Sequence, residues 1–218
     1  MATPHRAARV FGVLARRQSD LTIVAEDVHK PHNLSAMLRS CDAVGIGTVH
    51  ATAPTGGVPT YSATSASAEK WVDLVVHDRL DLALDEVQAQ SMQVLAAHFS
   101  EGAIDYRDAD YTRPTAILFG NERAGVSPRG AARADLHVTI PMLGMVRSLN
   151  VSVATAVILF EAQRQRREAG MYDRPALSAR TRNDLAFRWL YPRVADRLDA
   201  QNEAYPWLDP EGVPVADA

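Results

Sequence analysis

The segment VHKPHNLSAMLR, residues 28–39, carries polar side chains that a hydrophobic core does not need. It follows a predicted strand, Pro31 restricts its backbone, and Asn33 is a good N-cap for the helix that comes next. Arg39 has apolar neighbours, so we expect its side chain to be directed toward the ends of the strands, where a cation could stabilise developing negative charge. An ion pair with Asp42 is the structural alternative.

A second segment, ILFGNERAGVS, runs from Ile117 to Ser127. A buried strand is predicted to end at Gly120, with the acid Glu122 and a second turn at Gly125 after it. Ligands of open α/β sheets bind outside the carboxyl ends of the strands. The chain has neither a GxxxxGK[ST] loop nor a GxGxxG turn after a strand, so a dinucleotide fold and a Rossmann methyltransferase are not supported. A ligand held by backbone groups fits better.

A third segment, IPMLGMVRSLNVSVATAV, runs from Ile140 to Val157. It joins a predicted strand to an apolar helix through a methionine-rich loop, whose methionines could fill the core or line a ligand site. Ser148 suits an N-cap. Asn150 falls in the first turn of a buried helix, where its amide needs hydrogen-bond partners.

The histidines and the single cysteine do not predict a metal site. His29 and His32 are three residues apart but lack a third ligand. Cys41 cannot form an internal disulfide, which suits a reducing cytoplasm. No run of about 18 apolar residues is present, so we expect no transmembrane helix, and the N-terminal residues do not resemble a secretory signal.

The net charge of −3 conceals two basic segments. Residues 161–182 carry six arginines and three acids, and residues 1–19 carry four arginines and no acid: Arg6, Arg9, Arg16 and Arg17. Arginine is well suited to phosphate, so these segments predict contacts with RNA. Solvated helix faces are the alternative explanation.

Strands and helices are predicted to alternate along the middle of the chain, which favours an α/β fold with a parallel sheet. Connectors are predicted at 55–67 and 100–114, and an amphipathic helix at 178–198 before a loose acidic end. The helix 150–169 is apolar on every side in its first half, so it is expected to start in the core or in a subunit interface. Strands are predicted at 21–28, 48–53, 71–77, 93–99, 115–119 and 136–140, and helices at 33–44, 80–91, 128–134 and 150–169.

Together, the runs HKPHNLSAMLRSCDAVG, DYTRPTAILFGNERAGVS, IPMLGMVRSLNVSVA and EAQRQR resemble the SPOUT superfamily of RNA methyltransferases. Within it they resemble the TrmH type, which methylates the ribose 2′-hydroxyl of guanosine 18 in the tRNA D-loop. The resemblance implies an α/β SPOUT fold with a parallel-sheet core, a C-terminal deep trefoil knot, and flanking helices at both ends. It also implies a homodimer. We expect the protein in the cytoplasm, without a membrane partner, and we expect no metal because a sulfonium methyl donor does not need one. The expected parts are an Arg-rich N-terminal helix (1–19), the methyltransferase domain (20–170), and a C-terminal helix with an acidic tail (171–218).

The resemblance assigns roles to individual residues. S-adenosylmethionine would be held by main-chain groups near four residues: Ala97, Gly120, Ile140 and Leu149. Arg39 matches the catalytic arginine, which could act as a general base or as an electrostatic clamp, and the other matching residues are Asn33, Glu122, Ser148 and Asn150. Arg164 and Arg166 match arginines used for tRNA, and we add His32 and the four N-terminal arginines to this RNA-binding set.

Three alternatives stay open. The enzyme could act on another tRNA or rRNA site, although ribosomal relatives commonly carry an extra N-terminal RNA-binding domain, whereas here the first strand is predicted at Leu21. The chain could be a non-catalytic RNA-binding module, which the presence of Arg39 and Glu122 disfavours. A small-molecule α/β enzyme with a nucleotide cofactor is disfavoured because no glycine-rich phosphate loop is present.

Overall fold

The computed structural model describes residues 3–52 and 70–215, so the predicted connector 55–67 lies outside the described residues. The chain forms two compact units. The larger is Ser19–Ala169. The smaller combines Met1–Gln18 with Gly170–Ala218, so the predicted N-terminal helix and C-terminal segment pack into one unit.

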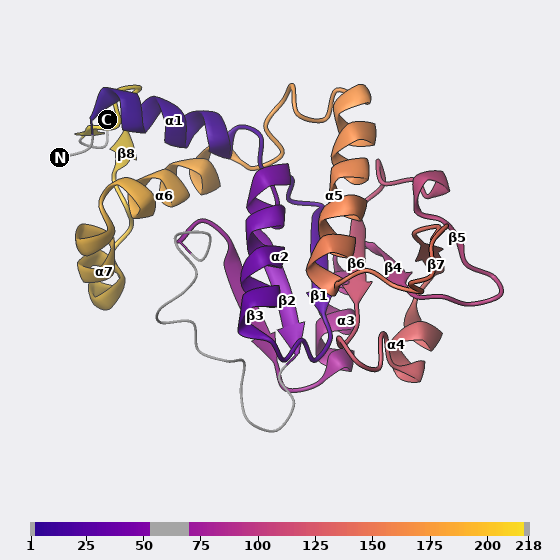
Figure 1. Ribbon diagram of the computed structural model, residues 1–218. Coiled ribbons are helices and arrows are strands. Elements are labelled where there is room, and N and C mark those ends of the chain that lie inside the picture. The colour runs from indigo at the N-terminus through magenta and orange to yellow at the C-terminus, as the bar shows by residue number, and fades with distance from the viewer. Residues whose placement is uncertain (1–2, 53–69, 216–218) are drawn as a thin grey trace. The chain divides into compact units, whose positions relative to one another are not determined.

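The larger unit is built on a seven-stranded sheet with the order β3-β2-β1-β6-β4-β7-β5, in which every pair of neighbouring strands is parallel (Figure 1). All carboxyl ends therefore meet at one edge of the sheet. The strands are β1 (Leu21–Ala25), β2 (Thr48–Thr52), β3 (Asp73–His77), β4 (Gln93–Ala97), β5 (Ile104–Asp105), β6 (Thr115–Phe119) and β7 (Leu136–Thr139). The helices are α2 (Pro31–Val44), α3 (Leu80–Ala89), η2 (Tyr106–Asp108), α4 (Pro128–Arg133) and α5 (Val151–Glu168).

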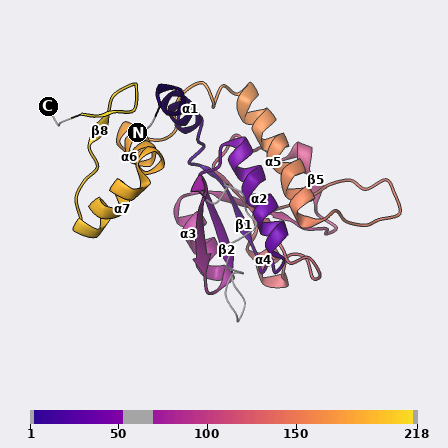
Figure 2. The same ribbon diagram turned by 60° about the vertical axis from the view of Figure 1, so that its left-hand side comes forward.

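Helices cover both faces of this sheet. Successive side chains of a strand point to opposite faces, so Ile23 and Ile117 pack under α2 and α5, whereas Val24 and Leu118 pack against α3. Helices α2 and α5 lie side by side in both ribbon views (Figures 1 and 2). Because β1 and β6 are buried on both faces, their sequences are wholly apolar or nearly so, as a central parallel strand requires.

The smaller unit contains α1 (Pro4–Leu14), α6 (Ala179–Leu190), α7 (Pro192–Gln201) and the two-stranded pair β8 (Trp207–Leu208) and β9 (Pro214–Val215). Ala7, Val10 and Leu14 of α1 pack against Ala186 and Leu190 of α6. The apolar face of the N-terminal helix is therefore buried against α6.

Two predictions for the C-terminal region are wrong. The helix predicted at 178–198 is two helices, because Tyr191 leaves helical geometry and Pro192 cannot continue the backbone hydrogen bonds and instead begins α7. The acidic end is ordered up to Val215. The Asn183 side chain donates to the carbonyl of Pro206 and accepts from the N–H of Leu208, which fixes the start of the β8–β9 pair.

The predicted parallel α/β fold is confirmed, and β6 matches its predicted range residue for residue. Two details differ. The connector 100–114 contains the edge strand β5, which is too short to show periodicity, and α2 begins at Pro31 with Lys30 as its N-cap. Asn33 is therefore not the cap. The trefoil knot stays a prediction. In the described ranges, no helix combines the length and apolar character needed to cross a membrane.

Candidate active site

A pocket of about 550 Å³ opens where β4, β6 and β7 end and α5 begins, entirely within the larger unit. Its apolar floor includes Phe119, Val138 and Ile158. Its rim consists of the loops after the three strands, so the fold gathers there residues that are far apart in the sequence. Pockets of this size at the carboxyl edge of a parallel sheet are the usual ligand sites of α/β proteins.

The loop after β6 forms a close-packed backbone wall of this pocket. Asn121 and Gly125 exchange two backbone hydrogen bonds, of 3.0 and 2.8 Å, and Gly125 adopts a left-handed conformation with φ of 70°. Gly120 has no room for a side chain, because an added Cβ would lie 2.0 Å from the backbone of Gly125 and Val126. The Asn121 amide donates to the carbonyl of Asp27, which joins this wall to the loop after β1.

A chain of hydrogen bonds runs from this loop to the start of α5. Glu122 accepts from the Asn33 side-chain amide at 2.8 Å and from the backbone N–H groups of Lys30 and His29 at 3.1 and 3.3 Å. The Asn33 side-chain oxygen accepts from the Asn150 amide at 3.1 Å. Asn150 in turn caps α5, because its oxygen accepts from the N–H of Ser152. We call Glu122, Asn33 and Asn150 the polar network.

The charge of Glu122 fixes the direction of these bonds. Partial burial raises the pKa of its carboxyl, but the hydrogen bonds from Asn33 and from the N–H groups of Lys30 and His29 outweigh burial, so the pKa is lowered overall. An ionised carboxylate only accepts hydrogen bonds. Asn33, which is 1% exposed, must therefore turn its NH₂ to Glu122 and its oxygen to Asn150. Asn150 was expected in the first turn of a buried helix, but it is the exposed N-cap of α5. Its amide nevertheless has the expected partners, because it donates to Asn33 and accepts from the N–H of Ser152.

The pocket brings together most of the predicted site residues. Those that line it are the four residues predicted to hold the cofactor (Ala97, Gly120, Ile140 and Leu149) and three of the predicted catalytic residues (Glu122, Ser148 and Asn150). Asn33 lies one hydrogen bond away. Asn121, His98 and the 84% exposed Phe99 also line the pocket and were not predicted, although each lies just after the end of a strand.

Arg39 lies elsewhere, and the expectation that its side chain is directed toward the strand ends is wrong. It is exposed, it is not among the residues lining the pocket, and within the described ranges no hydrogen bond or ion pair holds it. The reason is helical periodicity: Leu34, Met37 and Cys41 face the core, and position 39 falls on the opposite side of α2. Its catalytic role stays a prediction.

Two of the arginines predicted to bind RNA are buried, which overturns that assignment. Arg166 is 0% exposed, donates to the carbonyls of Tyr111, Asp20 and Arg113, and pairs with the Asp20 carboxylate at 2.5 Å. It joins α5 to the amino ends of β1 and β6, the sheet edge opposite to the pocket. Arg17, 2% exposed, lies over the ring of Trp189 in the smaller unit.

The remaining members of the predicted RNA-binding set are exposed. Arg164 is held between Glu161 and Glu168, with N–O distances of 2.7 Å to each. These carboxylates neutralise its charge, so a contact with RNA would have to replace them. The other exposed members are Arg6, Arg9, Arg16 and His32.

A parallel α/β domain with a backbone-walled pocket at the carboxyl edge of its sheet belongs to the class of α/β ligand-binding enzymes. Residues 20–160 match the SpoU rRNA methylase family model, and residues 164–217 match the model for the C-terminal region of SpoU rRNA methylases. The chain belongs to the SpoU rRNA methylase family.

Relatives and solved structures agree with this membership. The tRNA (guanosine(18)-2′-O)-methyltransferase of Thermus thermophilus is 55% identical over 86% of this chain and 97% of its own, and that of Escherichia coli is 45% identical over 99% and 95%. The crystal structure of the A. aeolicus TrmH/SpoU tRNA modifying enzyme superposes with a TM-score of 0.81 at 40% identity, over 87% of this chain and 97% of that one. The SpoU methyltransferase AviRb from Streptomyces viridochromogenes in complex with AdoMet matches with a TM-score of 0.62 at 28% identity, over 70% and 60%.

Proposed function

We propose that this protein transfers a methyl group from S-adenosylmethionine to the ribose 2′-hydroxyl of guanosine 18 in tRNA. The observation that carries the proposal is the convergence, at one pocket, of the backbone wall around Gly120 and the polar network of Glu122, Asn33 and Asn150. Relatives at 45–55% identity that bear the name of this activity support it further. A tRNA substrate implies a cytoplasmic location.

The pocket suits S-adenosylmethionine by its size and by the character of its walls. A mixed lining of apolar side chains and peptide groups fits an adenosine ring that is held by main-chain hydrogen bonds. The missing side chain at Gly120 lets backbone approach the ligand closely. The main-chain groups near Ala97, Gly120, Ile140 and Leu149 would hold the cofactor. When bound, it supplies an electrophilic methyl group on a sulfonium whose sulfur leaves readily.

The task left to the chain is to place the ribose hydroxyl in line with that methyl group and to remove its proton. The polar network holds the start of α5 against the loop after β6, so the shape of the pocket mouth is fixed before substrate binds. Arg39 lies outside this pocket. As the catalytic arginine it would therefore contact RNA that extends beyond the pocket, or it would act at the pocket of a second copy. Arginine stays protonated in proteins, which favours a clamp on phosphate and alkoxide over a general base, and the hydroxyl proton would then leave to water.

A homodimer is part of the proposal. Val153 and Phe160 lie two turns apart on one face of α5 and are about half exposed, and Leu143, Met145 and Val146 are exposed in the loop before the helix. Large apolar side chains concentrated at one place on a surface mark an interaction site. Light scattering should give twice the 23.8 kDa chain mass, and a monomer at micromolar concentration would remove this part of the proposal.

Exposed arginines supply the expected contacts to tRNA phosphates. Arg147 and Arg123 line the pocket, where they could hold the phosphates beside the target ribose. Arg6, Arg9 and Arg16 of the smaller unit offer further positive charge. Each unit therefore offers exposed cations to a polyanionic substrate such as tRNA.

Nucleoside mass spectrometry of total tRNA from cells with and without the gene tests the proposed function. Loss of 2′-O-methylguanosine at position 18 upon deletion, with recovery by the wild-type gene and none by Gly120→Ala, is the expected result. Unchanged methylation, in a cell with no second enzyme of this activity, would reject it.

A further inference from the structure

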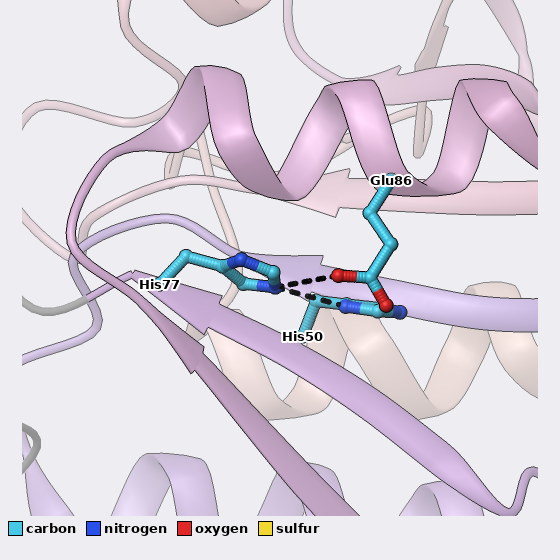
Figure 3. Close-up of side chains that lie close together, drawn as sticks. All are labelled: His50, His77 and Glu86. Carbon is cyan, nitrogen blue, oxygen red and sulfur yellow. Dashed lines mark hydrogen bonds and ion pairs between the residues drawn. The ribbon is translucent and has the colours of Figure 1, made fainter.

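A second group of polar side chains lies on the other face of the sheet, under α3 (Figure 3). His50 of β2 and His77 of β3 are 3% and 9% exposed. His50 pairs in register with Val75, so His77, two residues further along β3, points to the same face. Glu86 reaches down from α3 toward His77. The three residues, which we call the His–His–Glu cluster, are separate from the residues that line the pocket.

The potential ligand atoms of the cluster are spaced as in a metal site. His50 Nδ1 lies 3.1 Å from His77 Nε2, which lies 3.7 Å from Glu86 Oε2. Zinc bonds of about 2.0–2.1 Å in tetrahedral geometry put neighbouring ligand atoms about 3.3 Å apart. One ligand atom from each residue fits within 4.8 Å of the other two. Small side-chain rotations would bring all three onto a common centre.

One hydrogen bond joins two of the three side chains of the cluster. Two neutral imidazoles can share one hydrogen bond between Nδ1 and Nε2, but the 3.7 Å between His77 and Glu86 is too long for another. One nitrogen of each imidazole and one carboxylate oxygen therefore lie close together, and this is a donor set that divalent cations use.

We propose that His50, His77 and Glu86 form a binding site for Zn²⁺ or a chemically similar divalent cation. Two imidazoles and one carboxylate are a known zinc ligand set, and three protein ligands leave the fourth position to water. The Glu86 side chain is 45% exposed, so solvent reaches that side of the site. The ion would fasten the edge strand β3 to β2 and to α3. The sequence could not reveal the site, because its histidines are 27 residues apart and belong to different strands.

Cobalt and zinc titrations of the full-length chain without a histidine tag, stripped beforehand with a chelator, test the proposal. We expect one Co²⁺ per chain with the intense visible absorption of tetrahedral cobalt, displaced by Zn²⁺, and a rise in melting temperature with Zn²⁺. Glu86→Gln removes a ligand on a half-exposed side chain and should weaken zinc binding at least about tenfold, since loss of outer partners alone typically costs that much. His77→Gln should abolish binding.

Asp85→Asn is the matched control. Asp85 is the neighbouring acid on α3, but its carboxylate pairs with Arg133, so its loss should leave metal affinity unchanged. Because Glu86 is half exposed, the variant should fold even if a variant at buried His50 does not. Absence of tetrahedral cobalt absorption in the wild type, or equal zinc affinity in Glu86→Gln and Asp85→Asn, would overturn the site and leave a hydrogen-bonded histidine pair.

Discussion

Replacing Glu122 with glutamine isolates the contribution of charge to the polar network. The glutamine oxygen can keep the bonds from Asn33 and Lys30, but its NH₂ then faces the N–H of His29. The bond from buried Asn33 falls from the charge-assisted class, about 1.5–3 kcal/mol, to the neutral class, about 0.5–1.5 kcal/mol. The bonds from His29 and Lys30 add little, because both residues are exposed and water can replace the acceptor. We expect a loss of about 1–2 kcal/mol in the free energy of unfolding at pH 7.

The pH dependence of this loss gives a second test, by urea unfolding followed with circular dichroism. The pKa of Glu122 is lower in the folded protein than its ordinary value of 4.5, so its carboxylate stabilises the fold above that value. The stabilisation is lost as the pH falls through the folded pKa, and the two proteins should converge in stability there. Exposed Glu101 serves as the control through Glu101→Gln. Equal stability at pH 7, or a deficit that stays constant down to acid pH, would refute the reasoning.

Three further substitutions separate the parts of the site. Gly120→Ala should abolish S-adenosylmethionine binding in calorimetry while the sheet still folds, because the new Cβ would lie 2.0 Å from the loop backbone; normal affinity would contradict the close-packed wall. Arg166→Ala should cost about 3–5 kcal/mol of stability, because it leaves buried carbonyls and Asp20 without their partner, whereas exposed Arg164→Ala should leave unfolding unchanged. Arg39→Ala should slow methyl transfer about 100–1,000-fold with cofactor affinity intact, and Arg39→Lys should fail at every pH if the guanidinium is a clamp. Wild-type turnover by Arg39→Ala would return this arginine to a surface role.

The central strands could be predicted from sequence because they are buried on both faces. In β6, five consecutive residues are buried, and such a short continuous buried run is typical of a central parallel strand, so its bounds were predicted without error. The two-residue β5 has no period to read and was missed. At the start of α2, Pro31 fits the first helical turn as well as Asn33 fits a cap, and only the tertiary bonds of Asn33 decide between them.

The site residues in loops that follow strands could be predicted, whereas those on helices could not, because their position depends on which face of the helix is buried. Glu122 and Asn150 follow a strand or begin a helix, so parallel topology alone brings them to one edge. Arg39 and Arg166 depend on helix rotation. One residue of error in the inferred face turns a side chain by about 100°, which is enough to exchange an exposed arginine with a buried one. Arg39 was expected near the strand ends as the catalytic arginine and Arg166 on the surface as a tRNA contact, but Arg39 is exposed on α2 and Arg166 is buried.

The most direct test of the proposed activity replaces a single hydroxyl group in the substrate. Purified protein is incubated with labelled S-adenosylmethionine and either an unmodified tRNA or the same tRNA carrying 2′-deoxyguanosine at position 18 alone. The account predicts one methyl group per unmodified tRNA and none on the deoxy substrate, with both RNAs binding equally well. Equal methylation of the two tRNAs would contradict it, because the methyl group would then reside on another atom.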